Sequence, residues 1–160
     1  MAQVIITDQQ VISTSWREWG RTIVFGATTG LIFWLLTILL QRYVIDPIVC
    51  KQALNATLCS NSTPLSGNIA TILTAVIALV FMVRSGIARP VIIAVATAAL
   101  LWDLAAWTDG LFWVEAVLWS IGLYALTYAL FAWITRYATL WVTIVVSLLI
   151  VVIIRIALVL

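Results

Sequence analysis

The sequence predicts an all-α protein, a polytopic transmembrane helical bundle with about five membrane-spanning helices. Its 160 residues are 65% hydrophobic and 9% charged, whereas soluble domains carry about 25% charge and are roughly half apolar. The mean hydropathy is correspondingly high, at +1.21. The apolar residues also fall into five long runs, and a helix needs about 20 such residues to cross ~30 Å of hydrocarbon.

The expected spans belong to a single transmembrane domain over residues 22–160. Charges, prolines, glycines or polar clusters separate each run from the next. The runs lie near 22–45, 66–83, 88–108, 111–134 and 138–159, with an outer loop over 46–65. A chain of this length has no room for a second domain beside five spans.

Residues 1–21 are expected to form an N-terminal cytoplasmic or interfacial segment. The charges Arg17 and Arg21 come late, and the apolar run after them is too long for the core of a cleavable signal. The first helix should therefore remain in the protein. Apolar residues including Trp16 and Trp19 recur at helical spacing, which is typical of a short helix lying among lipid headgroups. A polar tail is the alternative.

The first span carries a face of small residues. Gly26 and Gly30 lie one turn apart in the segment GATTG, and glycines at this spacing let a second helix approach closely. We expect these helix-packing glycines to contact the second or fourth span. A helix of another subunit is the alternative partner.

The loop after the first span contains both cysteines of the chain, Cys50 and Cys59. We expect this loop on the extracytoplasmic side, in an oxidising compartment, where two cysteines in a polar loop most simply form one structural disulfide bond. A redox role is the alternative. It is less favoured because the chain has no Cys-x-x-Cys pair and no second pair to relay electrons.

The later spans differ in how they should pack. The second, third and fourth carry small residues along one side, which is typical of helices inside a bundle. The fifth, 138–159, is dominated by bulky β-branched residues, with Thr143 and Ser147 as a polar pair. We therefore expect the fifth helix at the edge of the bundle, facing mostly lipid.

Arginines near the span ends predict the orientation, because cytoplasmic loops collect Lys and Arg. The N-terminus should be cytoplasmic and the C-terminus extracytoplasmic, in a plasma (inner) membrane. The arginines assigned to the cytoplasmic side are Arg17, Arg21, Arg84, Arg89 and Arg136.

The stretch WDLAAWTDGLFWVE, residues 102–115, holds three of the six acidic residues. Asp103 and Glu115 should each lie about one helical turn below the outer boundary, with Asp109 in the turn between them. Two arginines are expected at the same depth. Together they form an outer polar cluster of Asp103, Asp109, Glu115, Arg42 and Arg155.

This outer polar cluster has two interpretations. It is either a salt-bridge network near water or a proton or cation site, because ionisable residues at membrane depth are candidates for function. The network is favoured because none of these charges lies near the bilayer midplane, where burial costs most.

The sequence offers no catalytic constellation, so the protein is not expected to be an enzyme. It has no histidine, no nucleophile beside a base, no phosphate-binding loop and no cluster of metal ligands. No cofactor or metal is expected. Tyr124 and Tyr128 could stack on a quinone-like ligand, but such aromatics more often fill a bundle. A net charge of +2 argues against nucleic acid.

Two functions from different classes fit these features. The first is a small integral membrane protein with a structural or accessory role, as a subunit of a larger membrane complex. Its partners would be the lipid bilayer and other membrane subunits or copies of itself. Several small-residue faces favour this role because they offer more packing surface than five short helices need. The second is a small ion or solute transporter or channel with an acidic site on the outer side.

Overall fold

The computed structural model describes residues 16–50, 62–87, 89–137 and 139–159. Within these ranges the chain is helical and has no strands, which confirms the predicted fold class. Five helical segments are long and apolar enough to span a membrane. They are Trp19–Ile48, Ser62–Arg84, Pro90–Trp107, Trp113–Arg136 and Leu140–Ala157.

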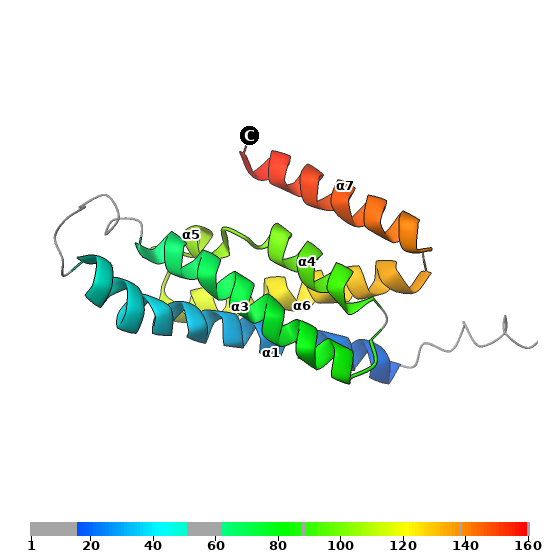
Figure 1. The fold of residues 1–160 in the computed structure, drawn as a ribbon, viewed down its shortest axis with the longest axis horizontal. Helices are drawn as coiled ribbons and strands as arrows, with labels where there is room; N and C mark the ends of the chain where they lie inside the picture. The colour runs from blue at the N-terminus through cyan, green and yellow to red at the C-terminus, as the bar shows by residue number, and fades with distance from the viewer. Residues whose placement is uncertain (1–15, 51–61, 88, 138, 160) are drawn as a thin grey trace, which may run out of the picture.

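The helices lie side by side and alternate in direction along the bundle (Figure 1). One end of the bundle, the arginine-rich end, carries Arg21, Arg84, Arg89 and Arg136, and the opposite, acidic end carries Asp103, Asp109 and Glu115. The elements in chain order are α1 (Trp16–Leu40), η1 (Gln41–Cys50), α3 (Ser62–Arg84), α4 (Pro90–Leu100), α5 (Leu104–Trp107), α6 (Trp113–Tyr137) and α7 (Leu140–Val159).

The first span is longer than the sequence predicted. It covers Trp19–Ile48, in a helix that begins at Trp16 and continues beyond α1 as the π-helix η1, which contains Pro47. A proline removes one backbone N–H and its ring clashes with the carbonyl of the preceding turn, and the wider π-helical turn accommodates that insertion. With α3 starting at Ser62, both helices extend into the predicted outer loop 46–65.

The third span is broken, which the sequence did not predict. After α4 the backbone leaves helical geometry at Leu101 (φ −97°, ψ 18°) and again at Asp103 (φ −103°, ψ 22°), the residue just before α5. The Asp103 carbonyl accepts hydrogen bonds from the Ala106 and Trp107 amides at 3.0 and 3.1 Å. A new short helix therefore starts at this aspartate, close to the acidic end.

The closest pair of helices is α1 and α6, which run antiparallel. A Cβ atom on Gly26 would lie 2.7 Å from the Cα of Ala125, and one on Gly30 would lie 2.5 Å from the Ser120 carbonyl oxygen. Any side chain there would force the backbones apart. The GATTG face is thus in contact with the fourth span inside this chain.

Aromatic side chains fill the space beside this contact. Tyr124 and Tyr128 on α6 are 2% and 1% exposed. The Phe25 ring meets Tyr128 edge-on at 5.5 Å between ring centroids, and Phe33 lies 5.3 Å from Tyr124. Edge-on and offset rings at these distances are favourable, so both tyrosines form part of the core.

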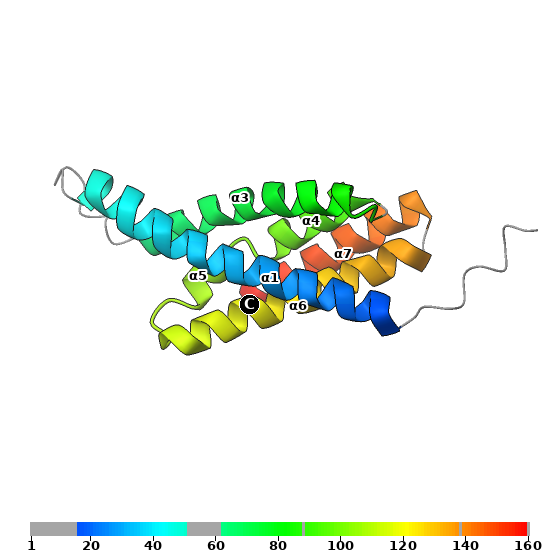
Figure 2. The ribbon, with the colours of Figure 1, turned by 90° about the horizontal axis from the view of Figure 1, so that it is seen from below.

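The last helix, α7, lies at the edge of the bundle beside α4 (Figure 1) and on the far side from α1 (Figure 2). It is the least buried of the five spans. Its polar pair nevertheless points inward, since Thr143 and Ser147 are 0% and 4% exposed. Arg89, just before α4, donates a hydrogen bond to the Thr143 hydroxyl at 2.9 Å.

Candidate functional site

The structure joins two members of the predicted outer polar cluster. Nη1 of Arg155 on α7 lies 2.6 Å from Oδ2 of Asp103, with the two side chains 30% and 40% exposed. Aspartate at the start of a helix commonly caps that helix with its own side chain. Asp103 makes no such bond, because its carboxylate is directed across to α7.

Asp109 belongs to a different place at the acidic end. It is exposed and lines a cavity of about 220 Å³ among α1, α3, α5 and α6. Gln41 and Thr63 border the same cavity, and the Gln41 amide donates to the Thr63 hydroxyl at 3.1 Å. The buried Ser120 closes its inner side. The lining is therefore mixed, with carboxylate, amide and hydroxyl groups against apolar walls.

Glu115 and Arg42 are separate from both of these groups. Both side chains are exposed, and Arg155 pairs with Asp103 rather than with Glu115. Among the described residues, the five predicted members thus form one ion pair, one cavity-lining acid and two outlying charges. They do not form one continuous site.

Glu115 instead borders a hollow along α6. With Leu118, Trp119, Gly122 and Leu126 it forms what we name the open face of α6, a shallow surface lined by residues of this helix alone. A Cβ atom on Gly122 would have no heavy atom within 4 Å. Gly122 differs from Gly26 and Gly30, which are both in close contact with the backbone of another helix.

The arginine-rich end contains a cavity that the sequence analysis missed. It measures about 400 Å³ and lies where α1 begins, α3 ends and α6 ends. Arg21 and Arg136 both line it, although they are far apart in the sequence. The orientation rule had placed both arginines at one end of the bundle, and this was the one available signal.

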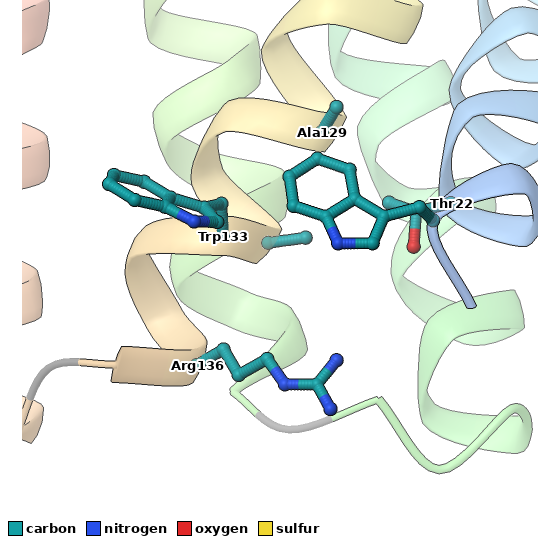
Figure 3. Close-up of a pocket in the computed structure, with 6 residues that line it drawn as sticks. Thr22, Ala129, Trp133 and Arg136 are labelled. Atoms are coloured by element: carbon teal, nitrogen blue, oxygen red, sulfur yellow. The ribbon is translucent and has the colours of Figure 1, made fainter. Parts of the chain in front are cut away.

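A smaller hollow of about 50 Å³ adjoins that cavity and shares Arg136 with it. Figure 3 shows Trp133 and Arg136 on successive turns of α6, with the arginine side chain extending to the side of α6 on which Thr22 of α1 lies. Trp19 also lines this hollow. Tryptophan rings are enriched at the level of lipid headgroups, so the rings are consistent with a position at the membrane surface.

Hydroxyl groups elsewhere in the bundle are mostly satisfied by their own helix. Thr29, Thr37 and Thr127, for example, donate to the carbonyl one turn earlier at 2.8 to 2.9 Å. Such bonds satisfy a hydroxyl without a partner helix or water. These three threonines are therefore no evidence for a polar pathway. The buried hydroxyls of Thr74, Thr97 and Ser147, by contrast, have no hydrogen-bond partner among the described residues.

Comparison with known protein families, characterised proteins and solved structures finds no match to this chain. In the described part of the chain, no group of three or more His, Cys, Asp or Glu side chains is placed to hold a metal ion. The side chain of Cys50 and all of Cys59 lie outside the described residues, so their disulfide bond stays a prediction.

Proposed function

We propose that this integral membrane protein is a non-catalytic accessory subunit of a larger membrane complex, and that a transmembrane helix of another subunit docks on the open face of α6. The observation that carries the proposal is the open space beside Gly122, where a Cβ atom would have no heavy atom within 4 Å. A glycine on an open helix face permits close backbone approach by another helix. Glu115, Trp119, Gly122 and Leu126 recur at spacings of three and four, which is the pattern of a helix–helix seam.

The charge at the end of this face favours a different subunit over a second copy. Copies of one chain share one orientation in the membrane, so a symmetric α6–α6 contact through Gly122 would bring the two Glu115 carboxylates toward each other. Like charges brought together at an interface oppose association. A partner helix with Lys or Arg near the acidic end would instead complement Glu115.

The open face can be tested by adding a side chain to it. Gly122→Leu places a bulky side chain on this face, and its Cβ meets no atom within 4 Å, so the variant should fold but lose its partner. Gly20→Leu is the matched control because Gly20 also has open space around it. The measurement is the size and composition of the assembly purified from native membranes in mild detergent.

Three results would count against this role. They are a wild-type protein that purifies as a single chain, an assembly made of copies of this chain alone, and an assembly that Gly122→Leu leaves intact. Glu115→Lys provides a second test. It should weaken binding of a partner subunit that carries a basic residue. If the contact is instead between two copies of this chain, a pair of one wild-type and one Glu115→Lys copy should bind more strongly than two wild-type copies.

We also propose the location and orientation. The arginine-rich end would face the cytoplasm and the acidic end the far side of a plasma (inner) membrane, because arginines concentrate on the cytoplasmic side. This places the Cys50 and Cys59 segment in a compartment that permits a disulfide bond.

The cavity containing Asp109 supports a second candidate, a small ion or solute transporter. A carboxylate beside amide and hydroxyl groups in a cavity of about 220 Å³ could receive a cation at the acidic end. Protein reconstituted in liposomes should then carry cation flux that Asp109→Asn abolishes and that Glu115→Gln, outside this cavity, preserves. Flux no greater than that of empty liposomes would reject the transporter.

A further inference from the structure

The cavity at the arginine-rich end is lined by two chemically different groups of side chains, which we name its polar half and its apolar half. Its polar half contains the guanidinium groups of Arg21 and Arg136, contributed by the start of α1 and the end of α6. Its apolar half contains Phe25, Ile87 and Ala132. A cavity lined by both charged and apolar side chains matches a ligand that is itself amphiphilic.

Hydroxyl groups add to the polar half. Ser85 follows α3 and is exposed, so its hydroxyl is available as a donor. The Thr135 hydroxyl already donates to the Ala132 carbonyl at 3.0 Å, so it can contribute an oxygen lone pair but not a proton. Arg136 already makes another interaction, but a guanidinium group has five N–H donors. The two guanidinium groups and the hydroxyl therefore still suit the several acceptor oxygens of a phosphate group.

The chain turn at this place is fixed by backbone geometry. Gly86 has a φ of +68°, a conformation that residues with a side chain rarely adopt. The Gly86 and Ile87 amides bond back to the last turn of α3 at 3.2 and 3.1 Å. Ser85 and Ile87 are therefore held against the cavity by a defined turn.

We infer that this cavity binds a phosphate group, and that an anionic phospholipid of the adjacent leaflet supplies it, with an acyl chain against Phe25 and Ile87. The same donors would accept free inorganic phosphate. The apolar half favours the lipid, because a free ion would leave that surface uncovered. Trp19 and Trp133 in the adjoining hollow are consistent with headgroup depth.

The test compares binding of phosphatidylglycerol and phosphatidylcholine to the purified full chain by native mass spectrometry from detergent. Phosphatidylglycerol should be retained in preference. Arg136→Gln and Arg21→Gln should each weaken its retention about tenfold, since each removes a charge-assisted hydrogen bond. Arg84→Gln is the matched control, because Arg84 is exposed at the same end but does not line the cavity.

Adding inorganic phosphate separates the two sources of the group. Lipid retention that persists in excess phosphate supports the phospholipid, whereas displacement of the lipid by phosphate supports a site for the free ion. Equal retention of both lipids, or equal losses in Arg84→Gln and Arg136→Gln, would overturn the inference. The unfolding midpoint of each variant is measured in parallel. If Arg136→Gln is unfolded, the result for Arg21→Gln decides the outcome, because the Arg21 side chain is exposed.

Discussion

The contact between Gly30 and α6 gives the sharpest stability prediction. In Gly30→Ala the new Cβ would lie 2.5 Å from the Ser120 carbonyl oxygen and 2.8 Å from the Ile121 Cα. Carbon atoms in contact are ordinarily about 3.5 to 4.0 Å apart. Because both neighbours are backbone atoms, no side chain can rotate away, and α1 and α6 must separate by roughly 1 Å at this point.

The expected cost follows from that separation. Overpacking a filled interior costs about 1–3 kcal/mol, while alanine in place of glycine regains up to about 1 kcal/mol of helix propensity. Gly30→Ala should therefore lower the free energy of unfolding by up to about 2 kcal/mol relative to the wild type, and by about 1–3 kcal/mol relative to a glycine-to-alanine change that overpacks nothing. A gap of this size also weakens the dispersion contacts of the atoms facing it, including the aromatic core next to the glycines.

The assay is unfolding by SDS titration in mixed micelles, followed by tryptophan fluorescence. Gly20→Ala is the matched control, because it lies in the same helix and a Cβ there meets nothing within 4 Å. It should be as stable as the wild type or slightly more so. If Gly30→Ala and Gly20→Ala unfold at the same midpoint, α1 and α6 are not held in close contact through Gly30.

Three further predictions address the polar contacts and the topology. In a double-mutant cycle, Asp103→Asn and Arg155→Gln should show a coupling of about 1 kcal/mol, modest because both side chains are partly exposed. Glu115→Gln in place of Asp103→Asn should show none, and coupling to Glu115 would contradict the observed pairing. Thiol labelling of protein purified without reductant should leave Cys50 and Cys59 unmodified, because disulfide-bonded cysteines have no free thiol. The disulfide bond would stabilise the folded protein by about 2 to 3 kcal/mol. Modification of both would reject the bond. Finally, a C-terminal reporter that is active only in the cytoplasm should be silent, and activity would imply an even number of spans or the opposite orientation.

The fold class and the spans could be predicted because they depend on properties that are local in the sequence. Each span is an uninterrupted apolar run, and the bilayer fixes its minimum length. The helix ends were less predictable. Pro47 and the polar residues after it suggested a loop, but the chain continues as a π-helix through Cys50, because a proline can be accommodated by a wider turn.

The pairing within the outer polar cluster could not be predicted from the sequence. Asp103 and Glu115 were placed at the same depth, and depth alone does not determine which of them faces Arg155. That depends on the rotation of each helix about its axis and on the break at residues 101–103, where the sequence LWD contains neither glycine nor proline. The break redirects Asp103 toward α7. Only the structure, and not the sequence, could therefore identify Asp103 as the partner of Arg155.

The cavity at the arginine-rich end was missed for a related reason. A net charge of +2 describes the whole chain and hides local concentration of charge. The alternating directions of α1, α3 and α6 bring Arg21 and Arg136 to one cavity, whereas Arg84 at the same end remains outside it. Topology therefore predicted the end of the bundle at which these arginines lie, and packing determined which of them share a site.

Two different ways of holding helices together follow from these contacts. The α1–α6 pair depends on glycines and close backbone approach, which bulky side chains would prevent. The last helix is rich in bulky β-branched residues and has no glycine, so it cannot pack in this way. Its polar contacts lie near its two ends instead, from Arg89 to Thr143 and from Arg155 to Asp103. The two helices α4 and α7 run in the same direction, and sliding α7 along α4 by one turn, ~5.4 Å, would break both contacts. The two arginines therefore set the register of α7, which its apolar surface alone would not specify.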